Sequence, residues 1–216
     1  MCALAVTLAG TANAGDDATL AAIQKAAPSC EPGDNYCFAI QLHVATSETG
    51  LVAGADWLKA QLAGANRHFG PLGVGFTLAG VDSLPDSAMH IETRADRNAL
   101  AVGRLGGRII HVFIVGQLDD VDVEGAIAYG VTWRRPNDNR KYIIVSAQAL
   151  ERTLAHELGH FFGLLHSTYD VSIMNKTERK EPPVEQRTFA DEEIAAMRPV
   201  LERLVRGKVI VAVKKF

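Results

Sequence analysis

The sequence has no apolar run long enough to cross a membrane, and it has no excess of basic residues. None of its hydrophobic stretches approaches the roughly 18 consecutive residues that a membrane-spanning helix needs. The 22 Lys and Arg residues stand against 25 Asp and Glu residues, which gives a net charge of -3. Proteins that hold nucleic acid through phosphate contacts have the opposite balance. We therefore expect neither a membrane span nor a nucleic-acid partner.

The chain also lacks the low hydrophobicity that is typical of disordered proteins. Of its 216 residues, 48% are hydrophobic and 22% are charged, as in an ordinary globular chain. This length suffices to bury one core without support from disulfides or metals. No internal repeat and no long linker divides the sequence, so we expect one domain.

Cysteine is scarce, and the three residues are Cys2, Cys30 and Cys37. Cys30 and Cys37 are seven residues apart and flank the turn sequence Pro32-Gly33. Such a pair suits a disulfide that forms in an oxidising compartment. Two free thiols are the alternative.

The N-terminal stretch MCALAVTLAGTANA (residues 1–14) is apolar and ends in an A-x-A pattern, as a signal peptide does. We expect cleavage before Gly15 and export, either to a periplasm or out of the cell. The stretch has no basic start, because the first Lys or Arg is Lys25. A start codon further upstream, or an ordinary apolar segment, is the alternative.

Apolar patterns predict a β-α chain up to residue 147. The expected helices cover 55–69 and 95–105, and the expected strands cover 38–46, 73–81, 108–116, 126–134 and 141–147. The next helix is expected to begin at Ser146 as its N-cap and to end at Gly163. Its apolar residues recur at spacings of three and four: Leu150, Leu154, Leu158 and Phe161. A last helix over 191–205 contains Pro199, where we expect a kink or a break, and the apolar run KVIVAV follows it.

The helix expected after Ser146 contains the motif HELGH, with His156 and His160 four residues apart. Residues at this spacing share one helix face, about 5–6 Å apart, so both imidazoles can reach one metal ion. Gly163 and His166 extend the match to H-E-x-x-H-x-x-G-x-x-H, in which the glycine lets the chain turn and bring back a third imidazole. Three imidazoles and a water form a catalytic zinc set. We expect Zn2+ at His156, His160 and His166, with Glu157 as the general base.

These residues resemble the zinc signature of the metzincin metallopeptidases. HELGHFFGLLH (156–166) matches the signature at every fixed position, and SIMN (172–175) resembles the Met-turn, whose methionine would be Met174. Ser167, directly after the third histidine, is similar to the matrixins, whereas AIAYG (126–130) is similar to pappalysin-like bacterial enzymes. The tyrosine ligand of astacins and serralysins is not indicated.

The resemblance implies an α+β fold with a mixed five-stranded sheet, an antiparallel edge strand and a zinc-binding helix. The catalytic domain would cover 15–216, with an N-terminal subdomain (15–163) and a small C-terminal subdomain with a helix (164–216). It would be a zinc-dependent endopeptidase that acts on peptides or proteins. Residues 126–133 would be the edge strand that binds the substrate backbone, and 175–177 would wall the pocket for the residue after the cut.

Two alternatives remain for the metal centre. In a gluzincin-like hydrolase, Glu178 or Glu181 would replace His166 as the third ligand. In a zinc-stabilised binding module, the ligands would remain without turnover, although such a module has no use for Glu157.

Other polar residues have weaker claims. His43, His68, His90 and His111 lack ligand spacing and are expected to be core or surface residues. The acidic residues between 119 and 124 offer oxygen ligands for Ca2+, but a solvated loop is the favoured interpretation: Asp119, Asp120, Asp122 and Glu124. Lys176, Arg179 and Lys180 look like part of a mixed charged surface. The sequence does not indicate the oligomeric state.

Overall fold

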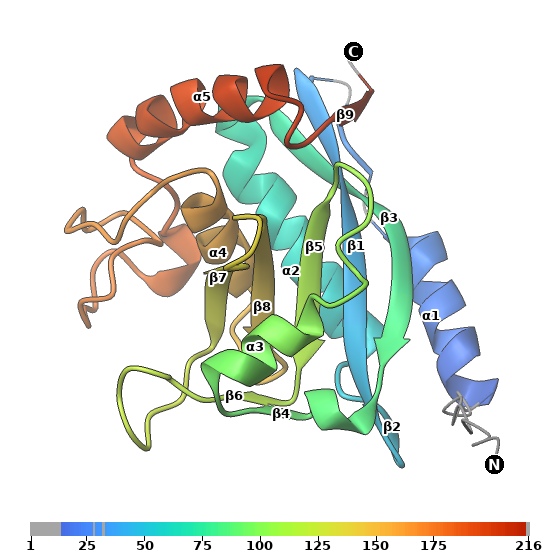
Figure 1. The fold of residues 1–216 in the computed structure, drawn as a ribbon. Coiled ribbons are helices and arrows are strands. Elements are labelled where there is room, and N and C mark those ends of the chain that lie inside the picture. The colour runs from blue at the N-terminus through green and yellow to red at the C-terminus, as the bar shows by residue number, and fades with distance from the viewer. Residues whose placement is uncertain (1–13, 28, 32, 215–216) are drawn as a thin grey trace, which may run out of the picture.

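A mixed β-sheet forms the centre of the fold (Figure 1). The computed structural model describes residues 14–27, 29–31 and 33–214. The five principal strands lie side by side in the order β3 (Val74–Leu84), β1 (Tyr36–Ser47), β5 (Ile110–Val115), β8 (Lys141–Ser146) and β7 (Gly130–Arg134). The first four are parallel, and β7 runs antiparallel to β8 at the edge. The predicted α+β fold with an antiparallel edge strand is confirmed.

Four short strands supplement these five. β2 (Gly50–Leu51) and β9 (Ala212–Lys214) each pair antiparallel with β1, so the apolar run near the C-terminus returns to the sheet. β4 (His90–Ile91) and β6 (Gln117–Leu118) form a small parallel sheet of their own.

Helices cover both faces of the sheet because its strands are apolar on both faces. Alternate β1 residues, among them Phe38 and Ile40, pack in one core with α1 (Ala14–Ala26), α2 (Ala55–Phe69), α4 (Thr153–Phe161) and α5 (Asp191–Arg206). The opposite face packs against α3 (Arg94–Leu100) around Phe113 and Tyr142. Short 3-10 turns occupy Gly70–Leu72, Asp86–Ala88 and Val184–Gln186.

The helix that carries the HELGH motif begins later than the sequence predicts. Ser146 is not its N-cap: the side chain of Ser146 donates to Gly116 O (2.9 Å) and accepts from Gln148 N at the end of β8. The chain then turns through Leu150, whose side chain is exposed, and α4 starts at Thr153. The predicted stop is confirmed, because α4 ends at Phe161 and Gly163 has a φ of +98°.

Other elements also differ from prediction, and the largest differences are in α3, β7 and α5. α3 ends at Leu100 and not at Leu105, and residues 126–129 lie outside β7. α5 continues through Pro199 as one helix, so of the expected kink or break, the break does not occur. The predicted helix over 55–69 matches α2 at both ends.

Cys30 and Cys37 form a disulfide with a Cα–Cα distance of 5.8 Å, which confirms the predicted bridge. The stretch expected to be a signal peptide lies outside the described residues, apart from Ala14. Among the helices that the structure describes, none combines the length and apolarity needed to cross a membrane.

Candidate metal centre

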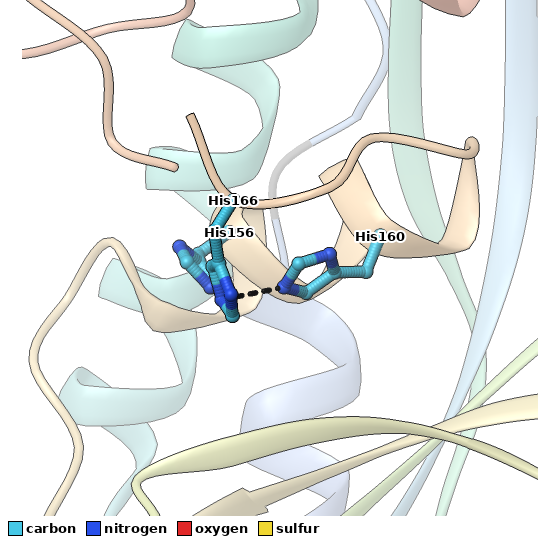
Figure 2. A group of neighbouring side chains, drawn as sticks. All are labelled: His156, His160 and His166. Carbon is cyan, nitrogen blue, oxygen red and sulfur yellow. Dashed lines mark hydrogen bonds between the residues drawn. The ribbon is translucent and has the colours of Figure 1, made fainter. Parts of the chain in front are cut away.

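Three histidine side chains converge beside α4 (Figure 2). His156 and His160 lie one turn apart on this helix. The chain reverses at Gly163, and His166 then returns to the same place. One ligand nitrogen from each histidine lies within 4.8 Å of the others. The structure therefore brings together all three residues that the motif predicts as metal ligands.

Backbone carbonyls fix the orientation of two of these rings. The Nδ1 atom of His156 lies 2.8 Å from Ile173 O, and that of His160 lies 2.8 Å from Leu164 O. A carbonyl only accepts, so each Nδ1 carries the proton and each Nε2 presents its lone pair. The Nε2 atoms of His160 and His166 are 3.1 Å apart. Two such nitrogens on tetrahedral zinc, at about 2.0–2.1 Å from the ion, would be separated by about 3.3 Å, so the spacing of this pair fits zinc.

The surroundings of the rings keep them neutral, as metal binding requires. Burial lowers the pKa of His156 to about 4, and the neighbouring positive charges act in the same direction. Loss of solvent likewise lowers the pKa of His166 to about 4 and that of His160 below its ordinary value. At neutral pH the three nitrogens are therefore free to bind a cation.

Glu157 is buried beside the triad and contacts the edge strand. Its carboxyl pKa is raised to about 7 by burial, against the opposing effect of a hydrogen bond with Thr132. Thr132 Oγ1 donates to the main-chain O of Glu157 at 2.6 Å and lies 3.0 Å from Oε2. A carboxyl group with this pKa exchanges a proton readily near neutral pH. Thr132 was not identified from the sequence, because only the pairing of β7 with β8 brings it to α4.

Met174 lies beneath the metal centre, as the Met-turn resemblance implies. It is fully buried, and a Cβ built on Gly159 would lie 2.8 Å from its sulfur. The turn is held by Ser172, whose hydroxyl accepts from Met174 N and contacts both carboxylate oxygens of Glu193 at 2.7 and 2.8 Å. Glu193 lies in the first turn of α5. It was missed because acidic residues are common at the start of any helix.

The charge of Lys176 acts on this whole centre. It lowers the pKa of His156, His160 and His166, although burial is the larger cause for each. It also opposes the rise in the pKa of Glu157. Lys176 was expected to belong to a mixed charged surface, and the structure places it beside the triad.

The outer edge of β7 faces away from the sheet. Ser146 N donates to Tyr129 O (2.9 Å), so these two residues form a hydrogen-bonded pair. Such pairs alternate along an antiparallel ladder with pairs that share no hydrogen bonds. The next pair, Gly130 and Val145, is therefore of the second kind. Val131 therefore directs its N–H and C=O to β8, whereas Gly130 and Thr132 direct theirs outward. The outward groups are the ones that an added strand would meet.

The remaining candidates lie elsewhere. His43 and His111 form a buried pair with an Nε2–Nδ1 distance of 3.0 Å, and His43 also contacts Asp82. His90 binds Asp119 in the acidic loop. Among the described residues, His156, His160 and His166 are the only group of three or more that could share an ion, so neither Ca2+ nor a ligand role for Glu178 or Glu181 has support.

The sheet with its antiparallel edge strand, the triad on α4 and the adjacent glutamate define the metzincin class of zinc metallopeptidases. Residues 87–198, more than half of the chain, match the family model Peptidase_M10, described as matrixin. The chain belongs to the matrixin family. Of the two subfamily resemblances in the sequence, this match favours the matrixins over the pappalysin-like enzymes. A search of curated proteins gave no match.

Two solved structures have a similar fold. Archaemetzincin from Methanopyrus kandleri has a TM-score of 0.52 and 16% identity, over 77% of this chain and 96% of that chain. Metalloproteinase-II from Bacteroides fragilis has a TM-score of 0.52 and 13% identity, over 81% of this chain. This chain spans 56% of the length of the second protein. At these identities the similarity concerns the fold.

Proposed function

We propose that this metallopeptidase is an exported endopeptidase, with His156, His160 and His166 as zinc ligands and Glu157 as general base. The observation that carries the proposal is the convergence of three imidazoles within 4.8 Å next to a buried carboxyl group. A purely structural zinc site needs no such carboxyl group.

Glu157 performs the proton transfers of the reaction. Bound Zn2+ supplies Lewis-acid chemistry, which acidifies water and polarises the scissile carbonyl. Glu157 accepts a proton from the attacking water as the water oxygen bonds to the carbonyl carbon. It then delivers that proton to the amine nitrogen as the C–N bond breaks. The buried position of Glu157 next to the triad lets one carboxyl group serve both steps.

The substrate backbone pairs with the outer edge of β7. Gly130 and Thr132 offer the outward N–H and C=O groups, and both lie against Glu157. An extended peptide that adds here as a further strand places its backbone beside the triad. Pairing along a strand engages residues on both sides of the cut, which supports internal cleavage of a chain.

Export is supported by two features outside the metal centre. The apolar N-terminal stretch ends in an A-x-A pattern, and the Cys30–Cys37 disulfide suits an oxidising compartment. Recovery of protein that begins at Gly15 from the periplasm or the medium is the expected result, checked by N-terminal sequencing. A protein that keeps residues 1–14 inside the cell would contradict export.

The chemistry is tested with Glu157→Ala and His166→Ala. Glu157→Ala should lower peptide hydrolysis at least about 100-fold and retain one zinc per chain, because the carboxyl group transfers protons and is not a ligand. His166→Ala should lose zinc, measured by elemental analysis, whereas Glu178→Ala and Glu181→Ala should keep it. Glu157→Ala with wild-type activity would refute the general-base role. Zinc loss in a glutamate variant, with His166→Ala unaffected, would refute the ligand set.

A further inference from the structure

The edge strand β7 meets a different helix on each face of the sheet. Gly130 and Thr132 lie against Glu157 of α4. Val131 and Trp133 are partly buried on the opposite face, in the core that contains α3. Side chains alternate along a strand, so β7 can bind α3 with one face while its other face lies beside the metal centre.

Trp133 is fixed to α3 by its indole ring. The Nε1–H group donates to Asn98 Oδ1 at 2.8 Å. The guanidinium carbon of Arg97 lies 4.8 Å from the centroid of the indole ring, within the range of a cation–π interaction. Arg97 is buried, and its Nη2 donates to Asp119 O at 2.6 Å. The indole therefore contacts two consecutive residues of α3, one of which is itself held in place.

The neighbouring strand β8 binds the same part of α3. Tyr142 lies directly opposite Trp133 in the pairing of the two strands. Its ring is fully buried, and its hydroxyl donates to Arg97 O at 2.7 Å. Two paired strand residues thus donate hydrogen bonds to consecutive residues of one helix.

The two strands differ in how much other support they have. β8 pairs with β5 and with β7, whereas β7 pairs with β8 alone among the strands that the structure describes. Loss of the bond between Trp133 and Asn98 should therefore loosen β7 and leave β8 in place. Loss of the Tyr142 bond should lower stability without moving the edge of the sheet.

Thr132 connects this contact to the proposed reaction. It precedes Trp133 in the chain, its Oγ1 donates to Glu157 O at 2.6 Å, and its backbone N–H and C=O face outward. A shift of Trp133 relative to α3 would move these outward groups relative to α4. The position of the substrate-binding edge thus depends on a contact on the far face of the sheet.

We propose that Trp133 is a positioning residue, which through its hydrogen bond with Asn98 holds the outward backbone groups of β7 in place for the substrate. The proposal rests on the proposed function and adds a residue that acts through its neighbour Thr132. Backbone pairing stabilises the bound substrate and the transition state alike, so its loss should raise KM and leave kcat nearly unchanged.

The test removes either partner of this hydrogen bond. Asn98→Leu replaces the acceptor with an apolar side chain of similar size, and we expect KM to rise about fivefold with kcat within about twofold of wild type. Trp133→Phe should give the same result. The double variant should be no worse than either single variant, because both lose the same bond. Asn98→Asp keeps an oxygen acceptor and should keep KM near the wild-type value.

Tyr142→Phe is the matched control. It also removes one hydrogen bond to α3, but from the strand that is supported on both sides. Urea unfolding should show a loss of stability, whereas KM should stay unchanged. An equal rise of KM in Tyr142→Phe and Asn98→Leu would show a general effect on the fold and would overturn the positioning role.

Two measurements do not depend on cleavage. Peptide binding to Glu157→Ala protein should weaken about fivefold when Asn98→Leu is added. Amide hydrogen exchange of Val131, relative to that of Ile114 in β5, should become about tenfold faster in Asn98→Leu and not in Tyr142→Phe. Both results stand even if Glu157 is not the general base. Unchanged peptide affinity and unchanged relative exchange in Asn98→Leu would overturn the proposal.

Discussion

Gly130 on the edge strand lies directly against Glu157. A Cβ built on Gly130 would lie 2.8 Å from Glu157 Cγ and 3.0 Å from Oε1. It would also lie 2.8 Å from Thr153 Cγ2, so neither neighbour leaves room for a side chain. Because Gly130 has no side chain, the proposed general base can lie directly against the outward-facing backbone of β7.

Gly130→Ala should therefore impair catalysis more than folding. The methyl group must displace the Glu157 carboxyl group, and we expect kcat/KM to fall about tenfold to 100-fold. Zinc content should stay at one per chain, because none of the three histidines is touched. Peptide hydrolysis and elemental analysis of the same sample measure both effects. Gly106→Ala, where a Cβ meets nothing within 4 Å, is the control. Equal kcat/KM in the two variants would contradict the steric argument.

The outward N–H and C=O groups of β7 predict which backbone amides of a substrate peptide are needed for binding. A proline at Val131 would remove a hydrogen bond to β8, so it would test the sheet and not substrate binding. N-methylated substrate peptides avoid this problem, because the protein stays unchanged. We expect kcat/KM to fall about tenfold or more when N-methylation meets the outward groups of Gly130 or Thr132, and little at the positions between. Alternation with a period of two along the peptide is the expected result. A uniform response would contradict strand addition.

The metal centre was more predictable than the segments that surround it. His156, Glu157 and His160 share one helix, so their relative positions follow from the helical repeat alone. His166 follows because Gly163 can take the positive φ that reverses the chain. These residues depend on contacts within eleven positions of sequence, which a motif can record.

Contacts between distant segments were not predictable in the same way. α4 starts at Thr153 because Gln61 on α2 accepts from Leu154 N (3.0 Å) and donates to Leu150 O (2.9 Å). The sequence near Ser146 gives no sign of these contacts with Gln61. Ser146 is a favourable N-cap residue, so it suggested the wrong first residue for α4. The proximity of Thr132 to Glu157 likewise depends on how β7 pairs with β8. The pattern of apolar residues predicts that these elements exist, whereas their polar contacts depend on packing.

His68 should make the folded protein less stable in acid. It lies buried on α2, its Nδ1 is 3.3 Å from Thr188 Oγ1, and burial lowers its pKa to about 4 from an ordinary value of 6.5. The unfolded chain therefore binds a proton at a higher pH than the folded chain does. Stability should fall as the pH drops from about 6.5 to about 4, by at most about 3 kcal/mol from this residue.

His68→Asn isolates this contribution. Asn does not titrate, and its side-chain amide can replace the Nδ1 contact with Thr188. Urea unfolding gives the free energies of unfolding of zinc-loaded wild-type and variant protein. It is measured between about pH 7.5 and about pH 4, a range that spans the pKa of His68 in the unfolded and the folded protein. The histidines of the metal centre titrate in both proteins, so their effect cancels in the comparison. We expect the variant to lose less stability than wild type over this range. Parallel curves for the two proteins would show that the buried His68 does not couple folding to pH.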